Sequence, residues 1–143
     1  MLIFTLFGTM YSQQKNVYNS NILIKNIWAR PAVKYANSAL YFIIKNIGNK
    51  TDTLISAQSN IAEETEVHES FKKENDRMGM RPAGKITINP KTELEFKPGG
   101  FHVMLLGVTK DLKIGDKIEA LILFKHAGRI KLKAEIRDTP ITN

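Results

Sequence analysis

The residues best suited to chemistry in this chain are histidines and methionines, because the sequence contains no cysteine. His102 and Met104 stand two positions apart in "PGGFHVMLLG" (98–107), an apolar run that follows a Pro-Gly-Gly turn. Side chains at positions i and i+2 of a β-strand point to the same face. We therefore expect His102 and Met104 to share one face and Val103 and Leu105 to share the other. The pair is either core filling or half of a binding site.

Two further residues, His68 and Met80, favour the binding site. Eleven residues separate His68 from Met80, and twenty-one separate Met80 from His102. Imidazole and thioether donors together suit Cu(I), a soft ion, better than they suit Mg, Ca or Mn. Thioethers also avoid the disulfides that cysteine ligands form in an oxidising compartment. Each residue alone is more often a packing or hydrogen-bonded group, but the four together indicate a soft-metal site.

The composition excludes several other classes of protein. The chain has 143 residues, of which 43% are hydrophobic and 24% charged, which is typical of one soluble globular domain. Without cysteine there are no disulfides, thiolate zinc sites, iron–sulfur clusters or blue-copper thiolates. The formal net charge is +7. However, the lysines alternate with apolar residues, as in 128–138, and do not interleave with aromatics, so we expect no nucleic-acid binding.

No catalytic constellation stands out. The chain lacks a G-x-S-x-G nucleophile motif, and Gly99-Gly100 is not followed by the lysine and hydroxyl residues of a phosphate loop. Acidic residues gather in "AEETEVHESFKKENDR" (62–77), a segment that we interpret as solvated surface. The sequence therefore predicts a protein that is not an enzyme.

The first residues suggest export. "LIFTLFGTMY" (2–11) is apolar, and no charge precedes Lys15. Such a run is too short to span a bilayer but suits the hydrophobic part of a secretory signal. We interpret 1–14 as a secretory signal segment, complete or truncated at its start, in preference to a first strand. The predicted location is periplasmic or otherwise exported, with no membrane span in the mature form.

Beyond residue 20 the sequence consists of short strand signals separated by turns. The predicted strands are 21–30, 38–46, 53–59, 65–70, 78–82, 85–88, 92–96, 101–108, 118–125 and 129–136. Nine or ten short strands without a convincing helix indicate an antiparallel sandwich or barrel. We expect one β domain over 20–138, a short tail over 139–143, and a monomer.

These residues resemble the periplasmic copper chaperones of the PCuAC type. The family signature is a histidine, a position that is often methionine, ten residues, a methionine, twenty-one residues and then His-x-Met. The matching positions here are His68, Glu69, 70–79, Met80, 81–101, His102, Val103 and Met104. The surroundings match as well, in "WARPA" (28–32), "ANSALYF" (36–42), "NIGNKTDTLISA" (46–57), "MGMRPAG" (78–84), "LEFKPGGFHVMLLG" (94–107) and "IGDKIEALILFKHAG" (114–128).

The resemblance covers about residues 22–137 and implies a cupredoxin-like Greek-key β-sandwich or barrel that binds one Cu(I). It implies His68, Met80, His102 and Met104 as ligands. The implied partners are cytochrome c oxidase subunit II, whose CuA centre receives the copper, or a thioredoxin-like copper-transfer protein. Glu69 departs from the signature, and Met78 is a candidate auxiliary ligand in its place. The alternative is a metal-free β-sandwich that serves as an interaction or adhesion module, in which the histidines and methionines are structural.

Overall fold

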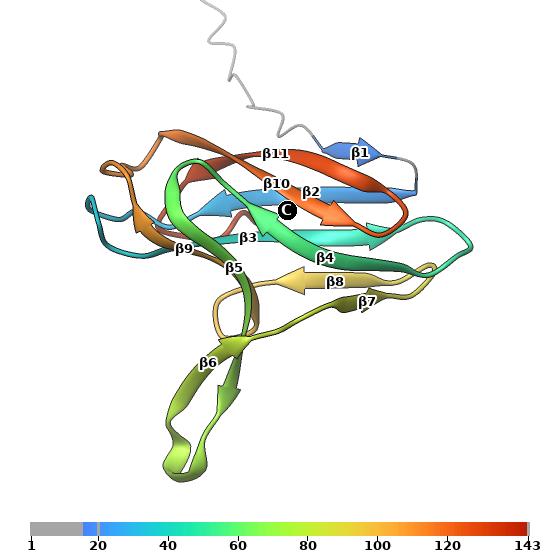
Figure 1. Cartoon of the computed structure of the whole chain (residues 1–143), viewed down its shortest axis with the longest axis horizontal. Coiled ribbons are helices and arrows are strands. Elements are labelled where there is room, and N and C mark those ends of the chain that lie inside the picture. The colour runs from blue at the N-terminus through green and yellow to red at the C-terminus, as the bar shows by residue number, and fades with distance from the viewer. Residues whose placement is uncertain (1–15, 20, 143) are drawn as a thin grey trace, which may run out of the picture.

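The computed structural model describes residues 16–19 and 21–142, and over these residues the fold is all-β (Figure 1). The predicted segment 1–14 lies outside the described residues. The strands are β1 (Val17–Asn19), β2 (Ile22–Ala29), β3 (Ser38–Asn46), β4 (Asp52–Gln58), β5 (Ala62–Lys72), β6 (Met78–Pro82), β7 (Ile86–Ile88), β8 (Glu93–Phe96), β9 (Phe101–Val108), β10 (Lys117–Phe124) and β11 (Gly128–Ile136). The one helical element in the described part is a single 3₁₀ turn, η1 (Glu74–Asp76). No described helix is therefore long and apolar enough to cross a membrane.

The strands follow from alternation of apolar and polar residues. In β11, Ile130, Leu132, Ala134 and Ile136 are buried, while Arg129 and the lysines between them are exposed. A period of two places one set on the core face and the other in water. The predicted all-β class is confirmed. The structure adds β1, which pairs with β2, to the strands that the sequence predicts.

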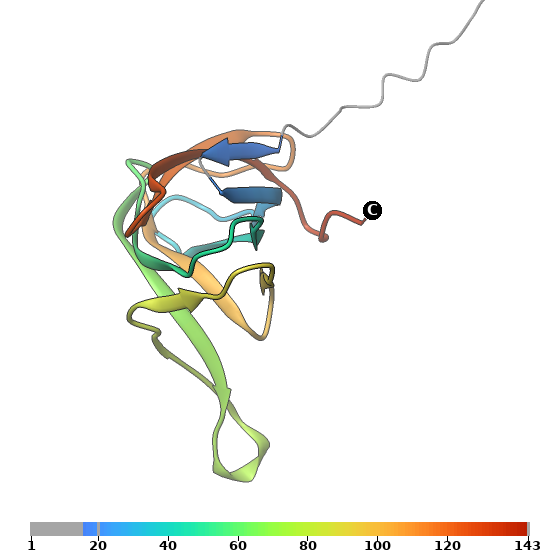
Figure 2. The ribbon, with the colours of Figure 1, turned by 90° about the vertical axis from the view of Figure 1, so that its right-hand side faces the viewer.

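All strands but β1 join in one continuous order, β6-β5-β9-β8-β3-β2-β11-β10-β4-β7, with a further pairing of β9 and β3. Every pairing is antiparallel except β11 with β2 and β8 with β9. The sheet curls around a common interior (Figure 2). Apolar side chains from both halves of this order fill the interior as one cluster, so distant strands share a single core.

A hairpin of β5 and β6 projects from the body (Figures 1 and 2). The sequence predicts a strand over 65–70 and a polar connector over 72–77; the structure extends the strand to 62–72 and makes the connector the hairpin turn. Arg81 lies 2.6 Å from a carboxylate oxygen of Glu69 and stacks 4.5 Å from the ring centre of Phe71. These contacts join the two strands on one face of the hairpin. The other face carries His68, Met80 and Met78.

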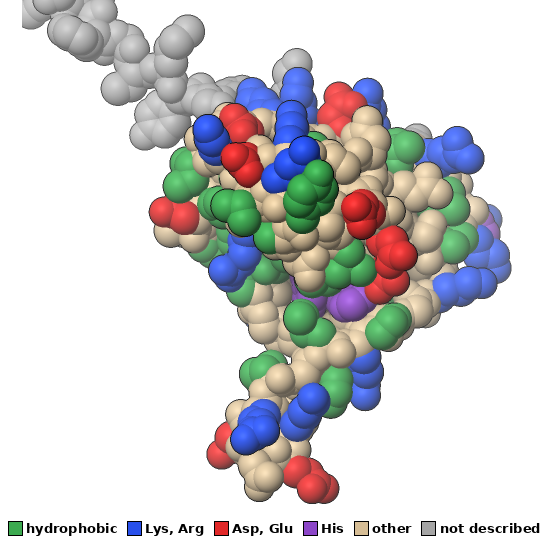
Figure 3. All heavy atoms as spheres, turned by 60° about the vertical axis from the view of Figure 1, so that its left-hand side comes forward, with side chains coloured by type: hydrophobic (Ala, Val, Ile, Leu, Met, Phe, Trp, Pro, Cys, Tyr) green, Lys and Arg blue, Asp and Glu red, His purple; other side chains and the backbone are tan. Residues whose placement is uncertain are grey.

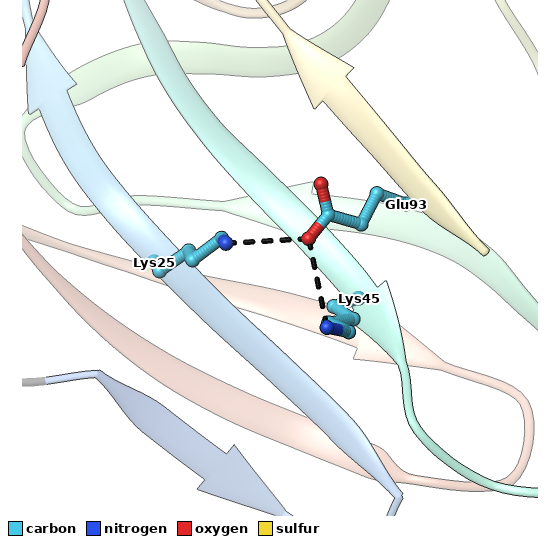
Figure 4. A network of polar contacts seen from close by, with 3 residues as sticks. All are labelled: Lys25, Lys45 and Glu93. Atoms are coloured by element: carbon cyan, nitrogen blue, oxygen red, sulfur yellow. Dashed lines mark ion pairs between the residues drawn. The ribbon is translucent and has the colours of Figure 1, made fainter. Parts of the chain in front are cut away.

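The outer surface of β2, β3 and β8 carries a small ion-pair network. The carboxylate of Glu93 lies 3.2 Å from the Lys25 ammonium and 3.9 Å from that of Lys45 (Figure 4). Exposed pairs of this kind contribute at most about 1 kcal/mol each. The network marks a solvated face formed by β2, β3 and β8. The histidines and methionines of interest stand on three other strands, β5, β6 and β9.

Candidate metal centre

His68 and His102 face each other across two neighbouring strands. β5 and β9 pair antiparallel with His68 directly opposite His102, and the two ring centres are 5.9 Å apart. His102 is 4% exposed, and the side chain of His68 is 13% exposed. Figure 3 shows histidine side chains in a hollow where the hairpin joins the body, bordered by hydrophobic and acidic side chains. The pair is therefore shielded yet close to the surface.

Each imidazole has one nitrogen engaged and one free. The Nδ1 of His102 lies 3.0 Å from the carbonyl oxygen of Gly100, and the Nε2 of His68 lies 2.6 Å from the Oε2 of Glu66. The other two nitrogens, Nε2 of His102 and Nδ1 of His68, are buried and have no hydrogen-bond partner. Buried polar atoms are normally paired, so these two nitrogens indicate a binding partner.

The protonation of His102 suits metal binding. Burial lowers the pKa of His102 below its usual value of about 6.5; the Gly100 carbonyl opposes this shift, and nearby His68 adds to it. A lowered pKa keeps the ring neutral at neutral pH. Because the Gly100 carbonyl can only accept, a neutral His102 carries its proton on Nδ1 and has its lone pair on the free Nε2.

Met104 shares the face of His102, as the strand period predicts. Val103 and Leu105 are fully buried in the main core, whereas Met104 belongs to a second cluster on the opposite face of the sheet, with Trp28, Ala39 and Tyr41. The rings of Trp28 and Tyr41 lie 4.6 Å apart. Met104 is 9% exposed, so its side chain is packed in this cluster, on the face of β9 that also carries His102.

Met80 lies on the same face but further away. In the β5–β6 pairing, Pro82 stands opposite His68, Met80 opposite Ser70, and Met78 opposite Lys72. Both methionines therefore point to the face of His68, and they are 57% and 59% exposed. Residues two apart on a strand are about 6.8 Å apart. Met80 therefore stands opposite the position two residues after His68, and Met78 stands opposite the position four residues after it.

The donor set fits a soft monovalent ion. An ion about 2.0 Å from a nitrogen of each ring lies about 3 Å from each ring centre, so two rings on one ion have centres about 5–6 Å apart. The observed separation is 5.9 Å. No described group of three or more histidine, aspartate or glutamate side chains has the geometry of a metal site. The thioethers of the methionines are therefore the donors that could complete a site around the two imidazoles.

The sequence did not single out Glu66. The acidic segment 62–77 is predicted to be solvated surface, but one of its carboxylates contacts His68 directly, and in the pairing of β5 with β9 Glu66 stands opposite Met104. The side chain of Glu66 is 42% exposed, as expected for surface, but that interpretation missed its contact with His68. The available signal was spacing, since Glu66 precedes His68 by two positions and so shares its face in a strand.

Comparison with known proteins finds relatives of this chain. The chain is 30% identical over 101 residues to "Uncharacterized protein RP573" of Rickettsia prowazekii, a match that covers 68% of this chain and 56% of that protein. It thus spans little more than half of this relative. It is 24% identical over 117 residues to "Putative lipoprotein Lxx21020" of Leifsonia xyli, covering 82% of this chain and 70% of that protein.

The fold is shared with solved domains. A copper-bound PCuAC domain from PmoF2 superposes with a TM-score of 0.72 at 21% identity, covering 87% of this chain and 99% of that one. The fold is thus the cupredoxin-like fold of PCuAC domains, as predicted. The family model described as LpqE-like matches residues 22–136, and the chain belongs to this family, which is the PCuAC family.

Proposed function

We propose that this chain is a copper chaperone that binds one Cu(I) ion through His68, His102, Met80 and Met104. The observation that carries the proposal is the pair of buried imidazole nitrogens without partners on two histidines that face each other across β5 and β9. The proposal is also supported by Met104, which stands on the face of β9 that carries His102, and by a PCuAC domain of the same fold that is copper-bound. The proposed role is metal transfer and not catalysis.

The four donors differ in how they are held. His68, His102 and Met104 are held by strand pairing and packing, whereas Met80 stands on the projecting hairpin. A bend of the hairpin toward β9 would bring Met80 to the ion. A ligand such as Met80 that can bind and release the ion independently of the other three suits transfer. A thiolate of the receiving protein can then replace the copper–ligand bonds one at a time. The role of Met78 is then auxiliary.

Titration of the purified protein with Cu(I), in competition with a chromophoric chelator, tests the proposal. We expect one tight equivalent in the wild type and strong loss of affinity in His102→Ala. His126→Ala is the matched control, because His126 is exposed in the turn between β10 and β11. Circular dichroism of each variant checks the fold. If the wild type does not bind Cu(I), the metal-free interaction module becomes the better description.

The receiving partner is proposed from the family resemblance. Copper would pass to the CuA centre of cytochrome c oxidase subunit II, directly or through a thioredoxin-like protein. The test mixes the Cu(I)-loaded chain with a metal-free soluble CuA domain and follows copper by gel filtration and metal analysis. If electrostatic docking of the basic chain, with its net charge of +7, guides transfer, high salt should slow it. Copper that stays on this chain would contradict the proposed delivery.

Export is part of the same proposal. The uncharged apolar segment 1–14 supports a periplasmic or otherwise exported chain, as does a relative named as a lipoprotein. Expression with a carboxyl-terminal tag, followed by fractionation and mass determination of the amino terminus, tests it. A chain that keeps its first residues and stays in the cytoplasm would contradict export.

A further inference from the structure

Glu66 is the charged side chain in direct contact with the candidate copper site. It stands on β5 two positions before His68 and directly opposite Met104 on β9. Its Oε2 atom lies 2.6 Å from the Nε2 of His68, and its side chain is 42% exposed. The carboxylate thus borders both an imidazole and the strand position of a thioether, and it remains reachable from solvent.

The contact determines which nitrogen His68 can offer. An ionised carboxylate has no hydrogen to donate, so the hydrogen of this bond resides on Nε2 of His68. The lone pair of a neutral ring then lies on Nδ1, which is the buried nitrogen without a partner. On the facing strand the assignment is reversed, because the Gly100 carbonyl engages Nδ1 of His102 and leaves Nε2 free.

We propose that Glu66 is the positioning residue of the copper site, and that it makes His68 bind through Nδ1 while His102 binds through Nε2. This inference rests on the proposed copper-binding function. Carboxylates that hold the second nitrogen of a metal-binding histidine fix its tautomer and the orientation of its ring, and they raise its basicity as a ligand. Glu66 also places a negative charge near a monovalent cation, which favours the bound ion.

The neighbouring acidic residues do not duplicate this contact. Glu69 points to the opposite face of β5 and pairs with Arg81 at 2.6 Å. Glu64 lies on the same face as Glu66 but one step further from His68, opposite Leu106, and is exposed. Glu64 is therefore a matched control, since it has the same charge, strand and face but stands away from the imidazole.

The test reads the tautomer first, without metal. Long-range ¹H–¹⁵N NMR of the metal-free protein at neutral pH should show His68 protonated on Nε2 and His102 protonated on Nδ1. Glu66→Ala should remove the Nε2–H preference of His68, Glu66→Gln should keep it through its amide oxygen, and Glu64→Ala should leave it unchanged. If Glu66 only stabilised the fold, its replacement would leave the tautomer of His68 unchanged.

Copper affinity is the second measurement. Loss of an outer-shell partner typically weakens metal binding about 10–100-fold, so Glu66→Ala should weaken Cu(I) binding by that factor. Glu66→Gln should restore the part of the Cu(I) affinity that comes from the hydrogen bond to His68. Glu64→Ala should bind Cu(I) as tightly as the wild type. The spectrum of the Cu(I)-loaded protein should show a metal-induced shift at Nδ1 of His68 and at Nε2 of His102.

The outcomes separate this inference from the proposed function. A protein that binds Cu(I), but whose His68 tautomer is the same in Glu66→Ala as in the wild type, overturns the role of Glu66 alone. So does a metal-induced shift at Nε2 of His68. A wild type with the expected tautomers but no Cu(I) binding overturns the proposed function, and with it any role of Glu66 toward copper.

Discussion

Replacement of Met104 separates two roles that its side chain combines in the proposed site. The residue packs against Trp28, Ala39 and Tyr41, and the same thioether stands on the face of the two histidines. Leucine keeps most of the volume but has no sulfur, whereas alanine loses both volume and sulfur. We expect Met104→Leu to lose copper affinity with little loss of stability, and Met104→Ala to lose both.

The magnitudes follow from burial. Met104 is 9% exposed, and a buried methionine replaced by alanine costs about 2–5 kcal/mol. The second cluster is small and borders solvent, so the lower part of that range applies, at about 2–3 kcal/mol. For a domain of this size that corresponds to a fall in Tm of roughly 6–15 °C. A leucine replacement that conserves volume costs less than about 1.5 kcal/mol.

Two assays on the same samples check this. Thermal denaturation of the metal-free proteins gives the packing cost, and chelator competition gives the Cu(I) affinity. Copper bound at a concentration about 1,000 times its Kd adds about 4 kcal/mol of stability, so the wild type should gain a large shift in Tm that Met104→Leu lacks. If Met104→Leu binds Cu(I) within threefold of the wild type, Met104 is a core residue and not a ligand.

Two further predictions concern the pH dependence and the hairpin. Because burial lowers the pKa of His102 in the folded state, the unfolded chain takes up a proton that folded His102 does not as the pH falls below about 6.5. The stability of the metal-free wild type should therefore fall from pH 7 toward pH 5 more steeply than that of His102→Gln in thermal denaturation, and equal slopes would refute this. Met80→Leu should weaken Cu(I) binding at least about tenfold, because loss of a direct ligand should cost no less than loss of an outer-shell partner. Met78 lies further from the histidines on β6, so Met78→Leu should stay within threefold of the wild type. The reverse order in chelator competition would make Met78 the ligand.

The short-range features of the site could be predicted from the sequence. Alternating apolar residues determine strands, and the period of two alone places His102 and Met104 on one face and buries Val103 and Leu105 on the other. The turn 98–100 is equally local, since Gly99 takes a φ of +81°, a left-handed conformation that favours glycine. The absence of cysteine restricts the soft donors to thioethers and imidazoles.

The contacts between strands could not be predicted in this way. His68 and His102 are more than thirty residues apart in the chain, and their direct opposition depends on the register between β5 and β9. The alternation of apolar residues opposes a slip of one residue, but it does not distinguish this register from one shifted by two, which would place His68 opposite Gly100 or Met104. The two-residue period already places Glu66 on the face of His68 and Glu69 on the opposite face, but the contact of Glu66 with the Nε2 of His68 is known only from the structure.

The donor types, their spacing along the chain and the all-β class follow from composition and from the two-residue period of a strand, so they can be read from the chain before it folds. Three features of the site emerge only in the folded molecule: which nitrogen of each histidine is free, the packing of Met104 against Trp28 and Tyr41, and the place of Met80 on a projecting hairpin. Hydrogen-bond partners and packing neighbours come from distant segments, and they meet only when the sheet closes around its core.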